Sequence, residues 1–179
     1  MKMLKKMLAI VLTGAMALTL LTACGSNAVN DKNIADALND IVKSSVAAGL
    51  TKDYTFKPRT DEQAMAKAIA ALSESDRHTT SGKDSEKVMK ILGLDESDAD
   101  EESRFVWWGA VFADEIGTAG QAYNVMDKIL SKDAVNADKL DGKEPGNIRY
   151  IGTALGTMTI PGGKQTTVRF IVVTAPVKG

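Results

Sequence analysis

The sequence predicts an α+β domain, an α-β-α layered structure whose N-terminal helices pack on an antiparallel sheet with a C-terminal hairpin. Between residues 33 and 131, apolar residues recur mainly at steps of three and four, the spacing of amphipathic helices. Residues 148–160 and 166–174 are instead rich in β-branched residues, and residues 161–164 between them read Pro-Gly-Gly-Lys, which is typical of a hairpin loop. The helices therefore come first and the hairpin last.

The two hairpin strands also predict what covers the sheet. Along residues 166–174 apolar side chains fall on both faces of the strand, so both faces need a cover of helices. Small residues line one side of the first strand, which predicts that a helix packs closely on its backbone. These small residues are Gly152, Ala154 and Gly156.

The N-terminal segment has the layout of a secretory signal. Residues 1–6 contain three lysines and no acid, residues 7–21 are apolar apart from two threonines and a glycine, and small residues follow up to Ala23. The apolar run is 15 residues long, whereas a membrane-spanning helix needs about 20. We therefore expect residues 1–23 to be a cleaved signal rather than a permanent transmembrane helix.

The end of this segment, Leu21-Thr22-Ala23-Cys24, resembles the lipobox of bacterial lipoproteins. The resemblance implies that a diacylglycerol is attached to the thiol of Cys24 and that this cysteine becomes the first residue. Cys24 is the only cysteine in the chain, so it cannot form an internal disulfide. Two acyl chains hold a protein stably at a membrane, which predicts a lipid anchor at the extracytoplasmic face of the cell membrane.

The remaining chain is long enough for one domain. Removal of residues 1–23 leaves 156 residues, of which 24–32 form a short polar lipidated tether and 33–179 a single globular domain. Loss of three lysines moves the formal charge from −1 to −4, and this mild acidity argues against a nucleic-acid partner. The expected partners are the membrane and an unidentified envelope ligand or protein.

The first helices are predicted from apolar spacing and from their boundary residues. Residues 33–48 form an amphipathic pattern that ends at Gly49, and residues 85–92 form a shorter one that ends at Gly93. Between them, a helix over residues 60–75 would begin with a capping box formed by Thr60 and Gln63.

The acidic stretch 95–102 holds six acids in eight positions but lacks the glycine and glutamate spacing of a calcium loop. We interpret it as the first turn of a helix that carries Phe105 to Ile116. The adjacent Trp107 and Trp108 would point in different directions, one into the core and the other to the rim of a groove or to a second buried face. A further helix over 118–131 would begin with a second capping box.

The order of elements resembles the CAP superfamily of cysteine-rich secretory proteins, antigen 5 and plant pathogenesis-related 1 proteins. The matching stretches span most of residues 33–174. They are an opening helix at 37–50, a second helix at 61–72, a histidine-containing turn at 78–82, a later helix at 122–131, and a strand at 151–156, Ile-Gly-Thr-Ala-Leu-Gly, which resembles the family's Ile-Gly-x-Gly-x strand. The resemblance implies the same α-β-α fold.

Family members with a conserved cavity use two histidines and two acids, sometimes around a metal. This chain has one histidine, His78, and the second would fall near Ala134. Glu115 is the nearest counterpart of the family's glutamate. The resemblance therefore implies a divergent member without the paired-histidine site, and we expect no metal and no cofactor.

His78 leaves three functions open. A loop role for His78 fits a non-catalytic binding or interaction domain. A cell-envelope hydrolase would use His78 with Glu115 or Asp114, although no Gly-x-Ser-x-Gly elbow is present for a nucleophile among the nearby serines. The nearby serines are Ser73, Ser75, Ser81 and Ser85. The third alternative is a solute-binding lipoprotein of a transporter, although 156 residues are few for two lobes around a cleft.

Overall fold

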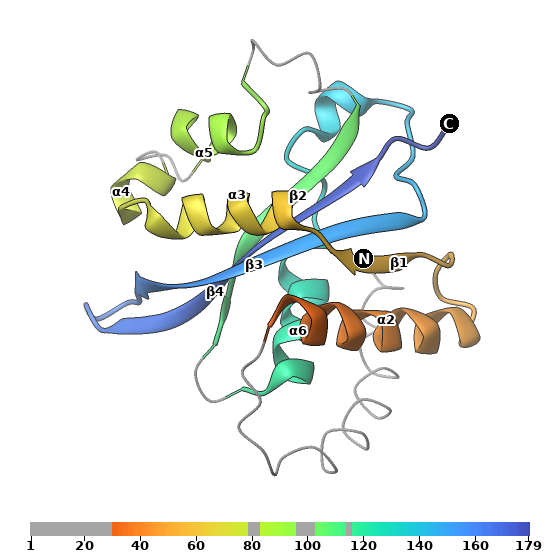
Figure 1. Cartoon of the computed structure of the whole chain (residues 1–179), viewed down its shortest axis with the longest axis horizontal. Coiled ribbons are helices and arrows are strands. Elements are labelled where there is room, and N and C mark those ends of the chain that lie inside the picture. The colour runs from red at the N-terminus through yellow and green to blue at the C-terminus, as the bar shows by residue number, and fades with distance from the viewer. Residues whose placement is uncertain (1–29, 79–82, 96–102, 114–115) are drawn as a thin grey trace.

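A computed structural model shows a four-stranded mixed sheet with helices on both faces (Figure 1). The strands are β1 (Thr55–Pro58), β2 (Arg104–Phe112), β3 (Ile148–Thr159) and β4 (Gln165–Pro176), in the order β1-β3-β4-β2. β4 runs antiparallel to both β3 and β2, whereas β1 runs parallel to β3. The α+β class and the C-terminal hairpin are confirmed, and the sheet is mixed rather than wholly antiparallel. The structure describes residues 30–78, 83–95, 103–113 and 116–179.

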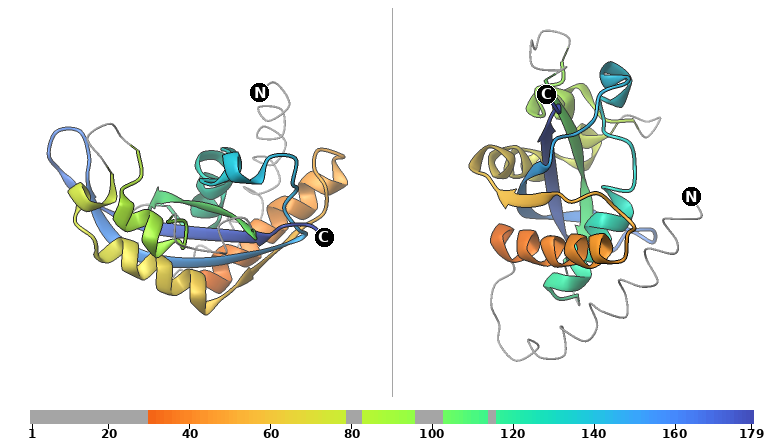
Figure 2. Two further views of the ribbon diagram at one scale, coloured as in Figure 1. Left: turned by 90° about the horizontal axis from the view of Figure 1, so that it is seen from above. Right: turned by 90° about the vertical axis from the view of Figure 1, so that its right-hand side faces the viewer.

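Two hydrophobic cores lie on the two faces of the sheet. Helices α2 (Asp31–Ala47) and α6 (Thr118–Lys128) bury their apolar residues in one core. Helices α3 (Thr60–Ala71) and α5 (Glu86–Ile91) bury theirs in the other. Figure 2 shows α3 and α6 on opposite sides of the curved sheet, which is the layered arrangement that the two-faced hairpin strand predicts.

Helix α2 begins after a residue type that caps helices, and it ends at the glycine where its end is predicted. The Asn30 side chain caps it by accepting the Asn33 N–H at 3.0 Å. Gly49 ends it with φ of +70°, a left-handed conformation that favours glycine. Six residues of one face are buried, which places α2 against the sheet. These residues are Ile34, Ala35, Leu38, Ile41, Val42 and Ser45.

Helix α3 lies directly on the backbone of β3, as the small residues of that strand predict. A Cβ atom at Gly152 would come within 1.9 Å of the Gln63 nitrogen and 2.1 Å of the Glu62 carbonyl carbon. At Gly156 it would come within 2.8 Å of the Phe170 ring. Glycine at these positions allows the helix to approach the sheet backbone.

The helix predicted from Phe105 to Ile116 is wrong, because residues 104–112 form strand β2. Phe105, Trp107 and Val111 face the α2–α6 core, while Val106 and Trp108 face the α3–α5 core. A strand buried on both faces carries an almost continuous apolar run, and such a run also contains pairs at helical spacing. Periodicity alone could not separate the two structures here.

Both predicted N-caps lie one residue too late in the sequence, and neither predicted capping box forms. The N-caps are Arg59 for α3 and Gly117 for α6, and neither helix has a side-chain cap. The two glutamines bond elsewhere: Gln63 donates to Asp31 at 2.8 Å, and Gln121 donates to the Ile116 carbonyl at 3.0 Å. The Gln63 amide therefore connects α3 with α2, and the Gln121 amide bonds to the residue before the N-cap of α6.

The remaining elements are short. Helix α4 (Glu74–Arg77) follows α3 at the position where one continuous helix to residue 75 was predicted, and the 3-10 turn η1 (Ala137–Leu140) lies between α6 and β3. Residues 1–29 and 96–102, which include the signal, Cys24 and most of the acidic stretch, lie outside the described residues. Among the residues that are described, none of the helices has the length and apolarity to cross a membrane.

Candidate functional site

A groove of about 490 Å³ follows the outer edge of β2. Its residues come from the C-terminal end of α6 and the turn after it, from His78 and Asp84, and from the hairpin strands β3 and β4. We call this feature the β2 groove. Its residues are Trp107 to Phe112, together with His78, Asp84, Lys128, Ile129, Lys132, Asp133, Val135, Met158, Ile160, Val168 and Phe170.

Trp108 forms the aromatic part of the groove and is held from two sides. Its indole N–H donates to Asp84 Oδ2 at 3.0 Å, and its ring stacks on the His78 imidazole with centroids 5.4 Å apart and planes at 20°. Local folding brings these side chains together, because His78 and Asp84 pair through an isolated antiparallel bridge. The indole is thereby fixed in one orientation at the groove wall.

The two tryptophans divide as their adjacency predicts. Trp107 is 6% exposed and packs in the α2–α6 core, where its indole N–H donates to the Lys132 carbonyl at 3.2 Å. Trp108 is half-buried and lines the β2 groove. The prediction that one tryptophan is core and the other lies at a groove is confirmed. Their side chains point in different directions because they alternate along the strand β2, not because they lie on a helix.

On the α6 side of the groove, a glycine of β2 leaves room for an isoleucine side chain. Ile129 packs over Gly109, where an added Cβ would come within 3.0 Å of Ile129 Cγ1. Beyond Ile129 the wall is polar and carries the exposed residues Lys128, Lys132 and Asp133. The groove therefore has an aromatic and aliphatic side and a charged side.

Among the described residues, the carboxylate that His78 meets in this groove is that of Asp84. The His78 Nδ1 atom lies 3.7 Å from Asp84 Oδ1, which is beyond hydrogen-bond distance. Glu115 and Asp114 lie outside the described residues. Sequence reasoning missed Asp84, since a lone aspartate after a turn carries no motif.

The nearby serines that the structure describes have hydrogen-bond partners of their own. Ser85 Oγ donates to the Asp76 carbonyl and accepts the Val88 N–H, and Ser73 and Ser75 bond each other at 3.0 Å. Ser81 lies outside the described residues. Among the described residues no three His, Cys, Asp or Glu side chains are grouped so as to hold a metal ion.

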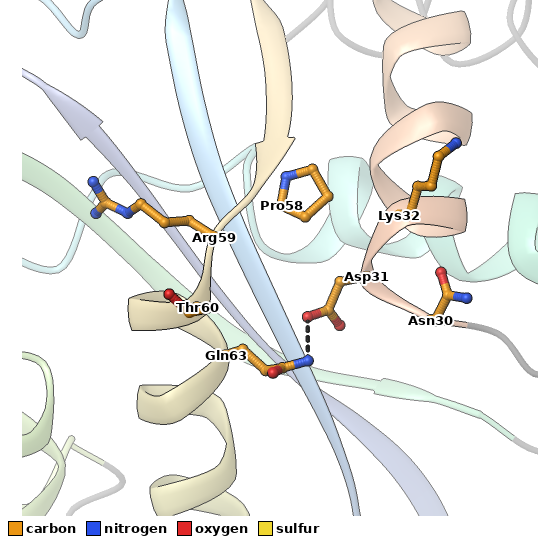
Figure 3. Close-up of a pocket in the computed structure, with 7 residues that line it drawn as sticks. All are labelled: Asn30, Asp31, Lys32, Pro58, Arg59, Thr60 and Gln63. Carbon is orange, nitrogen blue, oxygen red and sulfur yellow. Dashed lines mark hydrogen bonds between the residues drawn. The ribbon is translucent and has the colours of Figure 1, made fainter.

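A second, polar hollow of about 320 Å³ lies between the start of α2 and the start of α3 (Figure 3). Its polar side chains are used within the fold. Asp31 accepts from Gln63 and from the Thr153 N–H, while the Arg59 side chain points away from Asp31 and pairs with buried Glu62. Glu62 raises the Arg59 pKa through this hydrogen bond. We assign this hollow to the joining of α2, α3 and β3.

Comparison with known proteins provides no relative: no family model, no curated protein and no solved structure matches this chain. The resemblance to lipoproteins and to the CAP superfamily therefore depends on the sequence motifs alone.

Proposed function

We propose that this protein is a bacterial lipoprotein, anchored through lipid on Cys24 at the extracytoplasmic face of the cell membrane, whose domain binds an envelope ligand without catalysis. The basic, apolar and small-residue order of residues 1–23 supports the anchor. Helix α2 begins at Asp31, seven residues after Cys24. Seven extended residues reach about 25 Å, so the domain would stay close to the lipid surface.

The observation that carries the binding role is the fixed indole of Trp108 in the β2 groove. Aromatic side chains with few rotatable bonds give contact area at low entropic cost, and Asp84 and His78 hold this ring in place before any ligand arrives. The groove volume of about 490 Å³ lies in the range of ligand sites. A preformed aromatic groove supports binding better than it supports group transfer.

The anchor is tested by metabolic labelling with palmitate and by membrane fractionation of three proteins. The unchanged chain should carry label and sediment with membranes, and Cys24→Ser should lose both label and processing. A Cys24→Ser/Ser26→Cys double variant is the matched control, because it keeps one cysteine two residues out of the lipobox. Equal labelling of all three proteins, or unchanged labelling and processing of Cys24→Ser, would contradict the lipoprotein proposal.

A second candidate function is a cell-envelope hydrolase, and the observation that favours it is the meeting of His78 and Asp84 in the groove. A histidine beside a carboxylate can act as a general base. This function would need a nucleophile or an activated water that reaches His78. The separation of 3.7 Å between their nearest atoms would have to shorten when substrate binds.

The two functions differ in what His78→Asn and Asp84→Asn do. For a hydrolase, either change should lower the turnover of fluorogenic ester and peptide substrates by about a hundredfold or more. For a binding domain, the unchanged protein should show no turnover above the double variant. In that case His78→Ala should leave the fold intact and weaken ligand binding less than Trp108→Ala does.

We also propose that the domain is a divergent member of the CAP superfamily that lacks the paired-histidine cavity. The motifs over residues 33–174 support it, and the layered α+β class is compatible with it. The binding role is argued from the β2 groove and does not depend on this family.

A further inference from the structure

Side chains bond to several outward backbone groups of the strands β1 and β3. On β1, the Asn39 amide accepts from the Phe56 N–H at 2.7 Å and donates to the Phe56 carbonyl at 3.0 Å. On β3, Asp31 accepts the Thr153 N–H, Arg77 donates to the Thr157 carbonyl, and Glu74 accepts the Thr159 N–H. Uncapped edges invite pairing with other chains, and these caps prevent it.

The outer edge of β2 is capped only along its first half in the part of the chain described. Asn136 accepts the Val106 N–H at 3.1 Å and donates to the Arg104 carbonyl at 2.8 Å. In an antiparallel pair, alternate residues direct their backbone groups to the same side. The N–H and C=O groups of Trp108, Ala110 and Phe112 therefore face away from β4, and no described residue is paired with them.

A backbone group of the chain already bonds to the start of this edge. The Val135 N–H, in the turn that follows α6, donates to the Val106 carbonyl at 2.7 Å. Val135 and the residues from Trp108 to Phe112 line the same groove. The next outward groups, those of Trp108, Ala110 and Phe112, would be paired by the backbone of an added strand.

Side chains flank this edge on both faces of the sheet. Ile129 packs over Gly109 on the α2–α6 face, and His78 stacks on Trp108 on the other face. An isolated strand about 4.8 Å from β2 would therefore have side-chain neighbours on both of its own faces, and it needs no further structure of its own to reach them.

We propose that the β2 groove binds an extended polypeptide segment of another envelope protein, which adds as a strand to the outer edge of β2. The inference depends on the proposed binding function, since it names the class of ligand for the same groove. Main-chain hydrogen bonds supply affinity in strand addition, and alternate side chains supply specificity. Apolar side chains of the segment would lie toward Trp108, and polar or acidic ones toward Lys128 and Lys132.

The test uses the full chain in detergent micelles and a randomised library of peptides of about nine residues, long enough to span the edge. We expect enriched peptides to alternate apolar and polar residues and to change tryptophan fluorescence. Ala110→Pro removes one outward N–H without removing a β4 bond and should weaken enriched peptides about tenfold or more. Leu155→Pro is the matched control, because its N–H also faces outward, on β3, outside the groove, and it should leave affinity unchanged.

A second measurement needs no variant protein, so it holds even if Ala110→Pro fails to fold. Single N-methyl groups are placed along one enriched peptide. Methylation at every second position, where the N–H faces β2, should weaken binding about tenfold, and methylation at the intervening positions should have little effect. A flat methylation profile would overturn strand addition while leaving ligand binding in the groove intact.

Two further outcomes would overturn the inference. One is a library without any peptide that binds the unchanged chain better than Ala110→Pro. The other is a concentration-dependent dimer in sedimentation experiments that Ala110→Pro abolishes, which would assign the edge to a second copy of this chain. Neither outcome bears on the lipid at Cys24, whose labelling test is independent.

Discussion

Gly152 is the residue where the contact between helix and sheet is tightest. An added Cβ would overlap backbone atoms of both Glu62 and Gln63 in α3, and backbone cannot rotate away as a flexible side chain can. The pattern of small residues at 152, 154 and 156 made this contact predictable from sequence. What the pattern could not indicate is which helix lies there, since several amphipathic helices were available.

We predict that Gly152→Ala lowers the free energy of unfolding by about 3 kcal/mol or more, because α3 must move off the sheet. Chemical denaturation measures the change. Gly117→Ala is the matched control: a Cβ there meets no atom within 4 Å, and the expected loss is under about 1 kcal/mol. Similar losses in both variants would contradict the close packing of α3 on β3.

Trp108 and Asp84 illustrate how much of the site sequence could predict. The adjacent tryptophans drew attention to residues 107 and 108 because neighbouring side chains diverge in either kind of element. His78 was identified because it is the only histidine. Asp84 could not be identified, because its contact with Trp108 depends on the bridge that folds residues 78 and 84 together.

Arg77 explains how α3 ends without a glycine cap. Its guanidinium and Nε donate to the carbonyls of Ile69, Ala70 and Leu72 at the end of α3, and to Thr157 on β3. The side chain is 5% exposed, and burial lowers the Arg77 pKa from its usual range. Four carbonyl partners and the face of Phe170 at 4.4 Å compensate this burial.

Arg77→Lys should lower the free energy of unfolding by about 2 kcal/mol or more, since an ammonium cannot reach four carbonyls in the fork geometry of a guanidinium. Thermal and urea denaturation measure it. Lys43→Ala, which removes a solvent-exposed ion pair on α2, serves as the control and should change stability by less than about 0.5 kcal/mol. Equal stability of Arg77→Lys and the unchanged chain would show that these carbonyls need no arginine.

The contact between α4 and β3 depends on pH, because it is made by the carboxylate of Glu74. Its carboxylate accepts the Thr159 N–H, and this hydrogen bond lowers the Glu74 pKa. A lowered pKa in the folded state means that the stabilisation is present above the unfolded pKa and is lost as pH falls through the folded value.

The thermal midpoint should therefore drop more between about pH 6 and pH 3 in the unchanged chain than in Glu74→Gln, which keeps an acceptor without a charge. Asp36→Asn, which removes an exposed ion pair with Lys32, is the control and should follow the unchanged chain. Differential scanning calorimetry provides the comparison. An identical drop in Glu74→Gln would contradict a role of this carboxylate in acid lability.

The strand β2 shows where element prediction reached its limit. Its residues include Phe105, Val106, Trp108, Val111 and Phe112, which contain helical spacings by coincidence. The hairpin β3–β4 was predictable from the same kind of composition because a Pro-Gly-Gly turn separates its strands. β2 has no such turn beside it, and its partner β4 lies more than fifty residues away in sequence.

At the scale of the whole molecule, a chain of hydrogen-bonded polar side chains connects the start of α2 with the start of α6 through the strands β3 and β4. Asp31 at the start of α2 accepts from Thr153 on β3, and Thr153 accepts from Arg169 on β4 at 3.0 Å. Arg169 in turn donates to Gln121 near the start of α6 at 2.8 Å. Apolar periodicity predicted the layers, but charged residues inside them depend on partners from distant elements and could not be predicted.

The two proposals together describe a domain that is held at the membrane by lipid on Cys24 and that binds its ligand at the outer edge of β2. The most direct test of the lipid anchor is mass spectrometry of the N-terminal tryptic peptide of protein purified from membranes of its native host. The account predicts a peptide that begins at Cys24, ends at Lys32 and carries a thioether-linked diacylglycerol. A peptide that begins at another residue, or one with a free thiol at Cys24, would contradict it.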